Sequence, residues 1–411
     1  MTNQIFTNAT LFAGRDEQVV ERATLWLRDD QIAYAGPAAE FTASANETAL
    51  QGAVSEDLQG KFVMPGMTET HAHLSFADAS PFAIGATPVE QATITAVNNA
   101  ALMLRAGFTS AISFGSTYCI DVALRDAIAA GTITGPRLLA AGRDLGATAS
   151  NVDSPGGLSQ IADGPWALRK AVREQRRQRV DVVKIFIDGE AINPINPPGE
   201  LAFCEEEVNA VVDEAHRHGL RVACHARSAA AVKQAVRAGV DYIGHANYLD
   251  REAVDMLAAR NDALFVGPAI AWEVQYVEQC ESLGVSRETV RAQGYEAEIE
   301  ATVRSVEMLR DAGVKLVVGG DYGISIAPHG SYAKDLQYFV ELFDMRPAEA
   351  LLCATKNGGL AMSLGEENTT GTLAVGSAAD LLIVDGDPLA DIKVLQDLSK
   401  LTVIKDGQRV G

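Results

Sequence analysis

The chain has 411 residues, of which 47% are hydrophobic and 21% charged, and its formal net charge at pH 7 is −20. This composition is typical of a globular protein, and the length fits two or three domains or one large α/β barrel with insertions. The acidic balance disfavours nucleic acid as a partner, because phosphate binding needs clustered Lys and Arg. No run approaches the roughly 18 apolar residues of a membrane span. We therefore expect a protein that binds neither nucleic acid nor a membrane.

Cysteine usage and the first residues bear on the cellular compartment. The five cysteines are dispersed without CxxC spacing: Cys119, Cys204, Cys224, Cys280 and Cys353. Such a set is typical of a reducing compartment without a disulfide framework. The N-terminal residues show no basic segment followed by an apolar one, so no secretion signal is predicted. The expected location is the cytoplasm.

Both ends of the chain show the pattern of antiparallel strands. Residues 1–62 alternate apolar and polar positions between turns rich in Gly and Asn. Residues 361–411 repeat that pattern in the runs 371–388 and 401–410. We predict that the two ends form one small β-sandwich domain around a long middle segment.

The middle segment, residues 63–360, alternates short apolar runs with amphipathic helical stretches. One such stretch, 205–219, begins with acidic residues and ends at a glycine, as helices commonly do. A basic stretch, 169–179, is interpreted as a solvated helix face. Eight runs are predicted as strands: 63–76, 107–115, 136–145, 181–189, 220–226, 240–246, 263–271 and 315–323. Eight strands interleaved with helices predict the α/β class and a (β/α)₈ TIM barrel.

Histidines and one aspartate close several of these strands. His71 and His73 end the first run on the same face, because strand residues two apart point the same way. His225 ends the fifth run, His245 the sixth and Asp321 the eighth. Each alone could be a structural residue, but the carboxyl ends of barrel strands meet at one mouth. Together they predict a metal site with nitrogen and oxygen ligands suited to zinc or a similar ion.

Lys184 lies in the fourth run, where alternation puts it on one face with Val182 and Phe186. A lone ammonium among apolar residues is costly unless it is paired or neutralised. The side chain could extend its charged end to the rim. Alternatively, desolvation and nearby metal lower its pKa, and the free amine reacts with CO₂. The resulting carbamate is an anion with two oxygens that can bridge two cations.

These motifs resemble the amidohydrolase superfamily, and in particular its binuclear-metal branch. "MPGMTETHAHLSF", Lys184, His225, His245 and "GGDYG" follow the family order of ligands, and "GTLAVGSAADLLIVDGDPLADI" is also typical. The run 196–226 looks like Xaa-Pro and Xaa-Arg dipeptidases and molinate-hydrolase-like enzymes. The resemblance implies a homo-oligomer that binds two divalent metal ions, with zinc expected first. The implied ligands are His71, His73, carboxylated Lys184 as a bridge, His225, His245 and Asp321.

The implied activity is hydrolysis of an amide-type C–N bond in a small molecule by metal-activated hydroxide. Asp321 would act as the proton acceptor and Lys184 as the catalytic bridge. The substrate could be a dipeptide, an N-acyl amino acid or a xenobiotic amide or carbamate. The alternative is a mononuclear deaminase-type enzyme or another hydrolase of the superfamily. Such deaminases carry a glutamate three residues after the fifth-strand histidine, where this chain has Ser228.

Four further residues follow the predicted strand ends and are candidate substrate contacts. Arg227 shares a strand face with His225 and could hold a carboxylate through its planar fork, although a surface or interface arginine is an equal alternative. Asn247 and Tyr248 follow the sixth strand, and His329 lies in the loop after the eighth. The loops after the third and fourth strands, 146–157 and 189–200, are candidate lids or plain connections.

Overall fold

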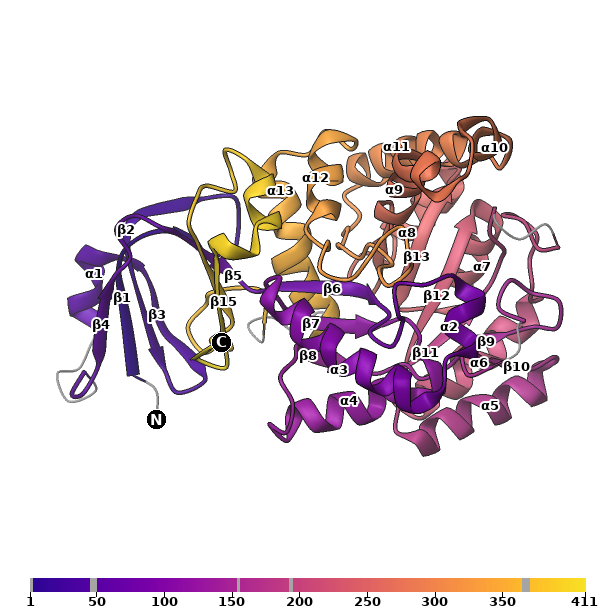
Figure 1. Cartoon of the computed structure of the whole chain (residues 1–411), viewed down its shortest axis with the longest axis horizontal. Helices are drawn as coiled ribbons and strands as arrows, with labels where there is room; N and C mark the ends of the chain where they lie inside the picture. The colour runs from indigo at the N-terminus through magenta and orange to yellow at the C-terminus, as the bar shows by residue number, and fades with distance from the viewer. Residues whose placement is uncertain (1–2, 45–49, 154–155, 192–194, 364–369) are drawn as a thin grey trace. The chain divides into compact units, whose positions relative to one another are not determined.

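The computed structural model describes residues 3–44, 50–153, 156–191, 195–363 and 370–411. It divides into two compact units (Figure 1). The terminal unit comprises Met1–Glu69, Ala101–Ser110 and Tyr332–Gly411, and the barrel unit comprises Thr70–Ala100 and Ala111–Ser331. Both ends of the chain therefore contribute to one unit, as predicted. No helix among the described residues is long and apolar enough to cross a membrane.

The terminal unit is built on an eight-stranded sheet with the order β17-β16-β15-β5-β1-β2-β3, in which β4 pairs with β1. The strands are β1 (Asn3–Phe12), β2 (Val19–Arg28), β3 (Gln31–Pro37), β4 (Val54–Asp57), β5 (Phe62–Pro65), β15 (Leu381–Val384), β16 (Leu401–Lys405) and β17 (Gln408–Arg409). The two chain ends join where β5 and β15 pair antiparallel, with Phe62 opposite Val384. Alternating apolar residues of both ends, such as Phe6, Leu25 and Ile383, form the enclosed core. This is the predicted β-sandwich.

Four helices also lie in the terminal unit. They are α1 (Ala38–Ser44), α12 (Lys334–Glu341), α13 (Pro347–Leu352) and α14 (Gly358–Ser363). Helix α3 (Val89–Arg105) begins in the barrel unit and ends in the terminal unit.

The barrel strands form two sheets, ordered β6-β7-β8 and β10-β9-β11-β12-β13-β14. The strands are β6 (Met67–Ala72), β7 (Phe108–Ser113), β8 (Arg137–Leu139), β9 (Asp144–Gly146), β10 (Ser159–Ile161), β11 (Val182–Phe186), β12 (Arg221–Ser228), β13 (Tyr242–Tyr248) and β14 (Phe265–Gly267). All neighbouring strands of the second sheet pair in parallel, as a (β/α)₈ barrel requires. A hydrogen bond links the two sheets: the Val182 N–H donates to the Ala140 carbonyl at 3.1 Å.

The predicted eighth strand, 315–323, is not a regular strand. Leu316 makes an isolated parallel bridge to Val266, and the Thr70 N–H donates to the Val318 carbonyl at 3.0 Å, so the segment still closes the barrel. At Gly319 an added Cβ would come within 2.8 Å of the backbone nitrogen of His71, so glycine allows the close approach of this segment to β6.

The barrel strands alternate with helices, as predicted. The helices are α2 (Pro81–Ala86), α4 (Ile120–Ala129), α5 (Pro165–Gln178), α6 (Glu205–Arg217), α7 (Ala229–Ala238), α8 (Arg251–Ala258), α9 (Ala271–Gln279), α10 (Arg287–Ala292) and α11 (Tyr295–Asp311). Helix α6 begins with the acidic first turn seen in the sequence, and Gly219, with φ of 71°, follows its last turn. Helices α5, α6 and α7 succeed one another outside β11 and β12 (Figure 1).

The basic helix α5 packs against α6 through a surface charge cluster, which we define as Glu214 with Arg169, Arg173, Arg217 and His218. The Nε of Arg173 donates to Glu214 at 2.7 Å, and Nη1 of Arg169 does so at 3.2 Å. The ring of His218 lies 3.0 Å from the same carboxylate. Arginines of the basic run thus form salt bridges with an acidic residue of the neighbouring helix.

Candidate functional site

One group of predicted ligands gathers where β6 ends. Ligand atoms of His71, His73 and Asp321 all lie within 4.8 Å of one another. Oδ1 of Asp321 is 3.1 Å from Nε2 of His73 and 3.6 Å from Nε2 of His71. Nδ1 of His73 lies 3.0 Å from the Gly115 carbonyl oxygen, which orients its ring and leaves Nε2 facing the aspartate.

A second group combines two predicted ligands with one residue that the sequence did not suggest. Ligand atoms of Glu190, His225 and His245 lie within 4.8 Å of one another. Oε1 of Glu190 is 3.5 Å from Nδ1 of His225, whose Nε2 lies 3.4 Å from the Gly189 carbonyl oxygen. Glu190 follows the strand that carries Lys184, and this position just past a strand end was the only signal in the sequence.

The imidazoles of these groups suit metal ligation. Burial lowers the pKa of His71, His225 and His245 well below its ordinary value, which keeps the rings neutral. A neutral imidazole offers a nitrogen lone pair to a cation, whereas a protonated one repels it. Nδ1 of His245 has no hydrogen-bond partner within the described part of the chain. The donor set therefore fits divalent metal ions.

Lys184 lies in β11 and is fully buried. Its Nζ has no hydrogen-bond partner among the described residues and faces the rings of Phe114, at 4.4 Å, and Phe186, at 4.9 Å. Burial lowers the pKa of Lys184, and the nearby carboxylates of Asp144 and Asp321 only partly oppose this effect. A buried amine without a hydrogen-bond partner is consistent with the predicted carbamate. Carboxylation would add two oxygens that cations can bind.

The backbone is strained at two predicted ligands. His245 has φ of 82° and Asp321 has φ of 58°, in a region that residues other than glycine seldom adopt. Such conformations persist where the surrounding structure imposes them, and they concentrate at functional sites. An added Cβ at Gly244, next to His245, would come within 2.9 Å of the His71 ring. Close packing thus fixes the histidine rings relative to one another.

Asp144, at the start of β9, is a further buried acid that the sequence did not single out. Burial raises the pKa of Asp144 to about 7, and the charges of Lys184 and His73 act against this rise. Its Oδ1 has no hydrogen-bond partner among the described residues. In the sequence it lies at the end of the predicted third strand. The same criterion that selected His225, His245 and Asp321, a polar residue at the end of a strand, could have identified it.

Arg227, predicted to contact substrate, lies at the centre of a buried arginine cluster, which we define as Arg227, Glu190, Asn247, Glu273 and Glu298. Nη1 of Arg227 donates to Glu273 and Glu298, at 2.6 Å each, and to Oδ1 of Asn247 at 3.0 Å. Its Nη2 lies 3.3 Å from Oε1 of Glu190. Burial, together with the adjacent Glu298, raises the pKa of Glu273 to about 8. A substrate carboxylate would have to compete with these partners.

The other three predicted substrate contacts differ in exposure. Asn247 is fully buried, and its Nδ2 donates to the Thr302 hydroxyl at 2.7 Å. His329 is buried with Nε2 3.2 Å from the Phe76 carbonyl oxygen, and burial lowers its pKa to about 4. Tyr248 is only partly buried. Of the four, Tyr248 has the most accessible side chain, and substrate binding by all four stays a prediction.

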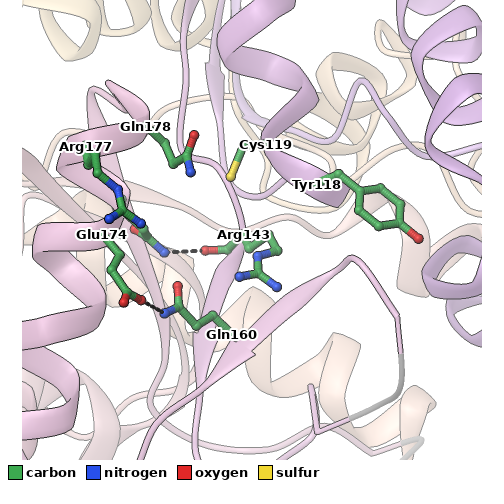
Figure 2. A pocket seen from close by; sticks show the side chains of 8 residues that line it. Tyr118, Cys119, Arg143, Gln160, Glu174, Arg177 and Gln178 are labelled. Atoms are coloured by element: carbon green, nitrogen blue, oxygen red, sulfur yellow. Dashed lines mark hydrogen bonds between the residues drawn. The ribbon is translucent and has the colours of Figure 1, made fainter.

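The candidate lids are described only in part, because residues 154–155 and 192–194 lie outside the described residues. A separate pocket of about 290 Å³ lies against helix α5 and contains none of the predicted ligands (Figure 2). Its lining includes Cys119, Arg143 and Arg177, and Gln160 donates to Glu174 across it at 2.8 Å.

Comparisons with known proteins agree with this geometry. A profile described as the amidohydrolase family matches residues 62–410. The ochratoxinase of Aspergillus niger is 28% identical over 427 aligned positions, which cover 98% of this chain and 85% of that protein. A crystal structure of that enzyme superposes with a TM-score of 0.85, at 26% identity, and covers 99% of this chain and 95% of that one.

Two other solved structures are similar over the whole chain. A prolidase in complex with N-methylphosphonate-L-proline has a TM-score of 0.86 at 26% identity and covers 99% of both chains. Molinate hydrolase, at 21% identity, has a TM-score of 0.79, with 99% of this chain and 94% of that one covered, and shows the common fold. The expected resemblance to dipeptidase-like and molinate-hydrolase-like enzymes is thus confirmed. The chain belongs to the amidohydrolase family and is a hydrolase that acts on C–N bonds.

Proposed function

We propose that this protein is a binuclear metal-dependent hydrolase that cleaves an amide-type C–N bond in a small molecule. The observation that carries the proposal is the pairing of two metal-capable groups with Lys184, whose buried amine lacks a hydrogen-bond partner in the described structure. Structural ion pairs alone do not account for such an amine, because an unpaired buried cation is costly.

In this proposal His71, His73 and Asp321 would hold one ion, and His225 and His245 would hold the other, with carboxylated Lys184 as a shared ligand. When bound, the ions, zinc in the first instance, would supply an acidic water and an electrophile for the scissile carbonyl. Burial lowers the pKa of His71, His225 and His245, which keeps these imidazoles neutral for this purpose. The Gly115 carbonyl orients the ring of His73.

Asp321 would move the proton. Its carboxylate lies 3.1 Å from Nε2 of His73. Burial alone would raise the pKa of Asp321, but the neighbouring His71, His73 and Lys184 outweigh burial and lower it. The carboxylate would accept the proton of the attacking water and return it to the leaving nitrogen.

The substrate class follows from the relatives together with the site. Ochratoxinase and prolidase are named for different small substrates, so we propose an N-acyl amino acid, a dipeptide or a xenobiotic amide or carbamate. The partly exposed Tyr248 is the best-placed of the predicted contacts for a polar group of the substrate. The basic side chain of Arg227 is already engaged by three carboxylates, which reduces its availability.

The alternative, a mononuclear deaminase-type enzyme, has less support. Ser228 occupies the position at which deaminase-type enzymes of the superfamily carry a glutamate. Its hydroxyl accepts a hydrogen bond from the Ala231 N–H at 3.2 Å and caps α7, and its own N–H donates to Asp188 at 2.9 Å. Ser228 thus has a structural role at the start of the helix.

The test is metal analysis combined with a substrate panel. The purified protein should contain two divalent ions per chain, lose activity on chelation and regain it with zinc. Dipeptides, N-acyl amino acids and carbamates would be screened by release of the amine. Protein that holds no metal and hydrolyses its substrate equally well in chelator would contradict the proposal.

A further inference from the structure

We propose that Glu190 is an additional protein ligand of the ion held by His225 and His245, and that Arg227 positions its carboxylate. This inference rests on the binuclear centre of the proposed function. It assigns a role to a residue outside the predicted set of six ligands.

The first support is geometric. Oε1 of Glu190 lies 3.5 Å from Nδ1 of His225, and the ligand atoms of Glu190, His225 and His245 fall within 4.8 Å of one another. Nδ1 of His225 has no hydrogen-bond partner in the described part of the chain, although it faces this carboxylate. A cation between the two atoms would use both lone pairs.

The second support is the balance of charge. Arg227 faces the carboxylates of Glu273 and Glu298, each at 2.6 Å from Nη1, and that of Glu190, at 3.3 Å from Nη2. One guanidinium therefore faces three acidic side chains in a region where burial makes unbalanced charge costly. A divalent ion on the far side of Glu190 would supply the missing positive charge.

The third support is the backbone at Glu190 and the two residues before it. The Glu190 N–H donates to the Asn196 carbonyl at 3.0 Å, and Asp188, two residues earlier, accepts from the Arg227 N–H at 2.9 Å. At Gly189 an added Cβ would come within 1.7 Å of the Asn196 carbonyl oxygen, so only glycine fits there. The carboxylate is thus presented from a fixed backbone, as a ligand needs to be.

The competing interpretation is that Glu190 is only a partner of Arg227. In that case its loss would affect stability but not the affinity of either ion. The two interpretations separate when metal binding is measured directly, without reference to turnover.

The experiment compares wild type, Glu190→Gln and the control Glu200→Gln, an exposed glutamate of the same loop. Each protein is stripped by chelator and titrated with zinc against a chromophoric competitor, and metal is counted by mass spectrometry. In Glu190→Gln one of the two ions should bind at least about 10-fold more weakly, while Glu200→Gln keeps both affinities. With cobalt(II) in place of zinc, the visible spectrum of only one of the two bound ions should change.

Two unchanged affinities in folded Glu190→Gln would overturn the inference and leave the proposed function intact. A wild type that never binds a second ion would instead overturn the proposed function itself. If Glu190→Gln does not fold by circular dichroism, Glu190→Asp keeps the charge but shortens the side chain. It should weaken the same ion, and wild-type affinities in Glu190→Asp would also refute the assignment.

Discussion

The buried arginine cluster and the surface charge cluster are opposite in sign. In the first, one cation, Arg227, faces three carboxylates, and in the second, one carboxylate, Glu214, faces three arginines and a histidine. They differ in the exposure of the groups around the central charge. Side chains of the buried cluster are 13% exposed or less, whereas Glu214 is buried but its partner Arg173 is 55% exposed.

This difference shows how burial changes the free-energy cost of leaving a charge without its partner. Solvent reaches the cations of the surface charge cluster, so removing one of them costs little. In the interior each unpaired charge carries a desolvation penalty of several kcal/mol, so the group is stable only when every member is present. The same reasoning separates Lys184, buried without a hydrogen-bond partner in the described structure, from the exposed Lys170 of α5.

The largest contrast should come from the lysines. Lys184→Ala removes the proposed bridge, and we expect activity to fall at least about 1000-fold because both ions lose a shared anionic ligand. Small carboxylates such as formate or acetate should restore part of it. Lys170→Ala, on the exposed face of α5, is the control with unchanged activity. Initial rates on the best substrate measure both, and a fully active Lys184→Ala would exclude a bridging role.

The second contrast concerns the two arginines. Arg227→Met leaves buried carboxylates without their cation, and we expect a loss of about 3–5 kcal/mol in unfolding free energy. Arg173→Met should lose far less, because Glu214 keeps other partners. Urea unfolding followed by circular dichroism measures both. Equal losses would show that burial does not distinguish the clusters.

The third contrast uses metal removal. Because ions bind the folded barrel and not the unfolded chain, free zinc at 100 times the dissociation constant of a site should stabilise the folded protein by about 3 kcal/mol for each ion bound. Calorimetric unfolding with and without chelator should show this shift in wild type and in Arg173→Met alike. An unfolding temperature that is the same with and without chelator would argue against metal binding in the barrel.

The smallest effect is a pH dependence of the surface charge cluster. The hydrogen bond from Arg173, followed by that from Arg169, lowers the pKa of Glu214 from 4.5 to about 2. A lowered pKa stabilises the folded state above the unfolded value and loses this effect as pH falls towards the folded value. After screening by solvent the contribution is at most about 1 kcal/mol. The stability difference between wild type and Glu214→Gln should therefore shrink between pH 5 and pH 3, and a difference that grows on acidification would contradict the assignment.

Much of the architecture could be predicted because local patterns determine it. The alternation of short apolar runs with amphipathic stretches gave the barrel, and the strand period of two placed His71 beside His73. The eighth strand could not be predicted accurately. Its run of β-forming residues looks regular, but in the structure Leu316 makes only an isolated bridge to Val266.

The electrostatic surroundings of the site could not be predicted from local patterns. Glu273 and Glu298 lie on helices α9 and α11, where an acidic residue usually faces solvent. Only the tertiary fold brings them to Arg227, which the sequence presented as a substrate contact or a surface or interface arginine and which is in fact fully buried. Glu190 has no periodic pattern around it, since it lies in a loop. Its relation to His225 is set by the pairing of β11 with β12.

The pairing of β5 with β15 has a consequence for how the protein is made. Phe62 emerges from the ribosome more than 300 residues before its partner Val384. At ordinary elongation rates the gap is on the order of tens of seconds. During that interval the apolar edge of β5 is open to other chains in the cell. Nascent chains truncated before Leu381 should therefore aggregate or recruit chaperones, even though the barrel segments that carry every proposed ligand have already been synthesised.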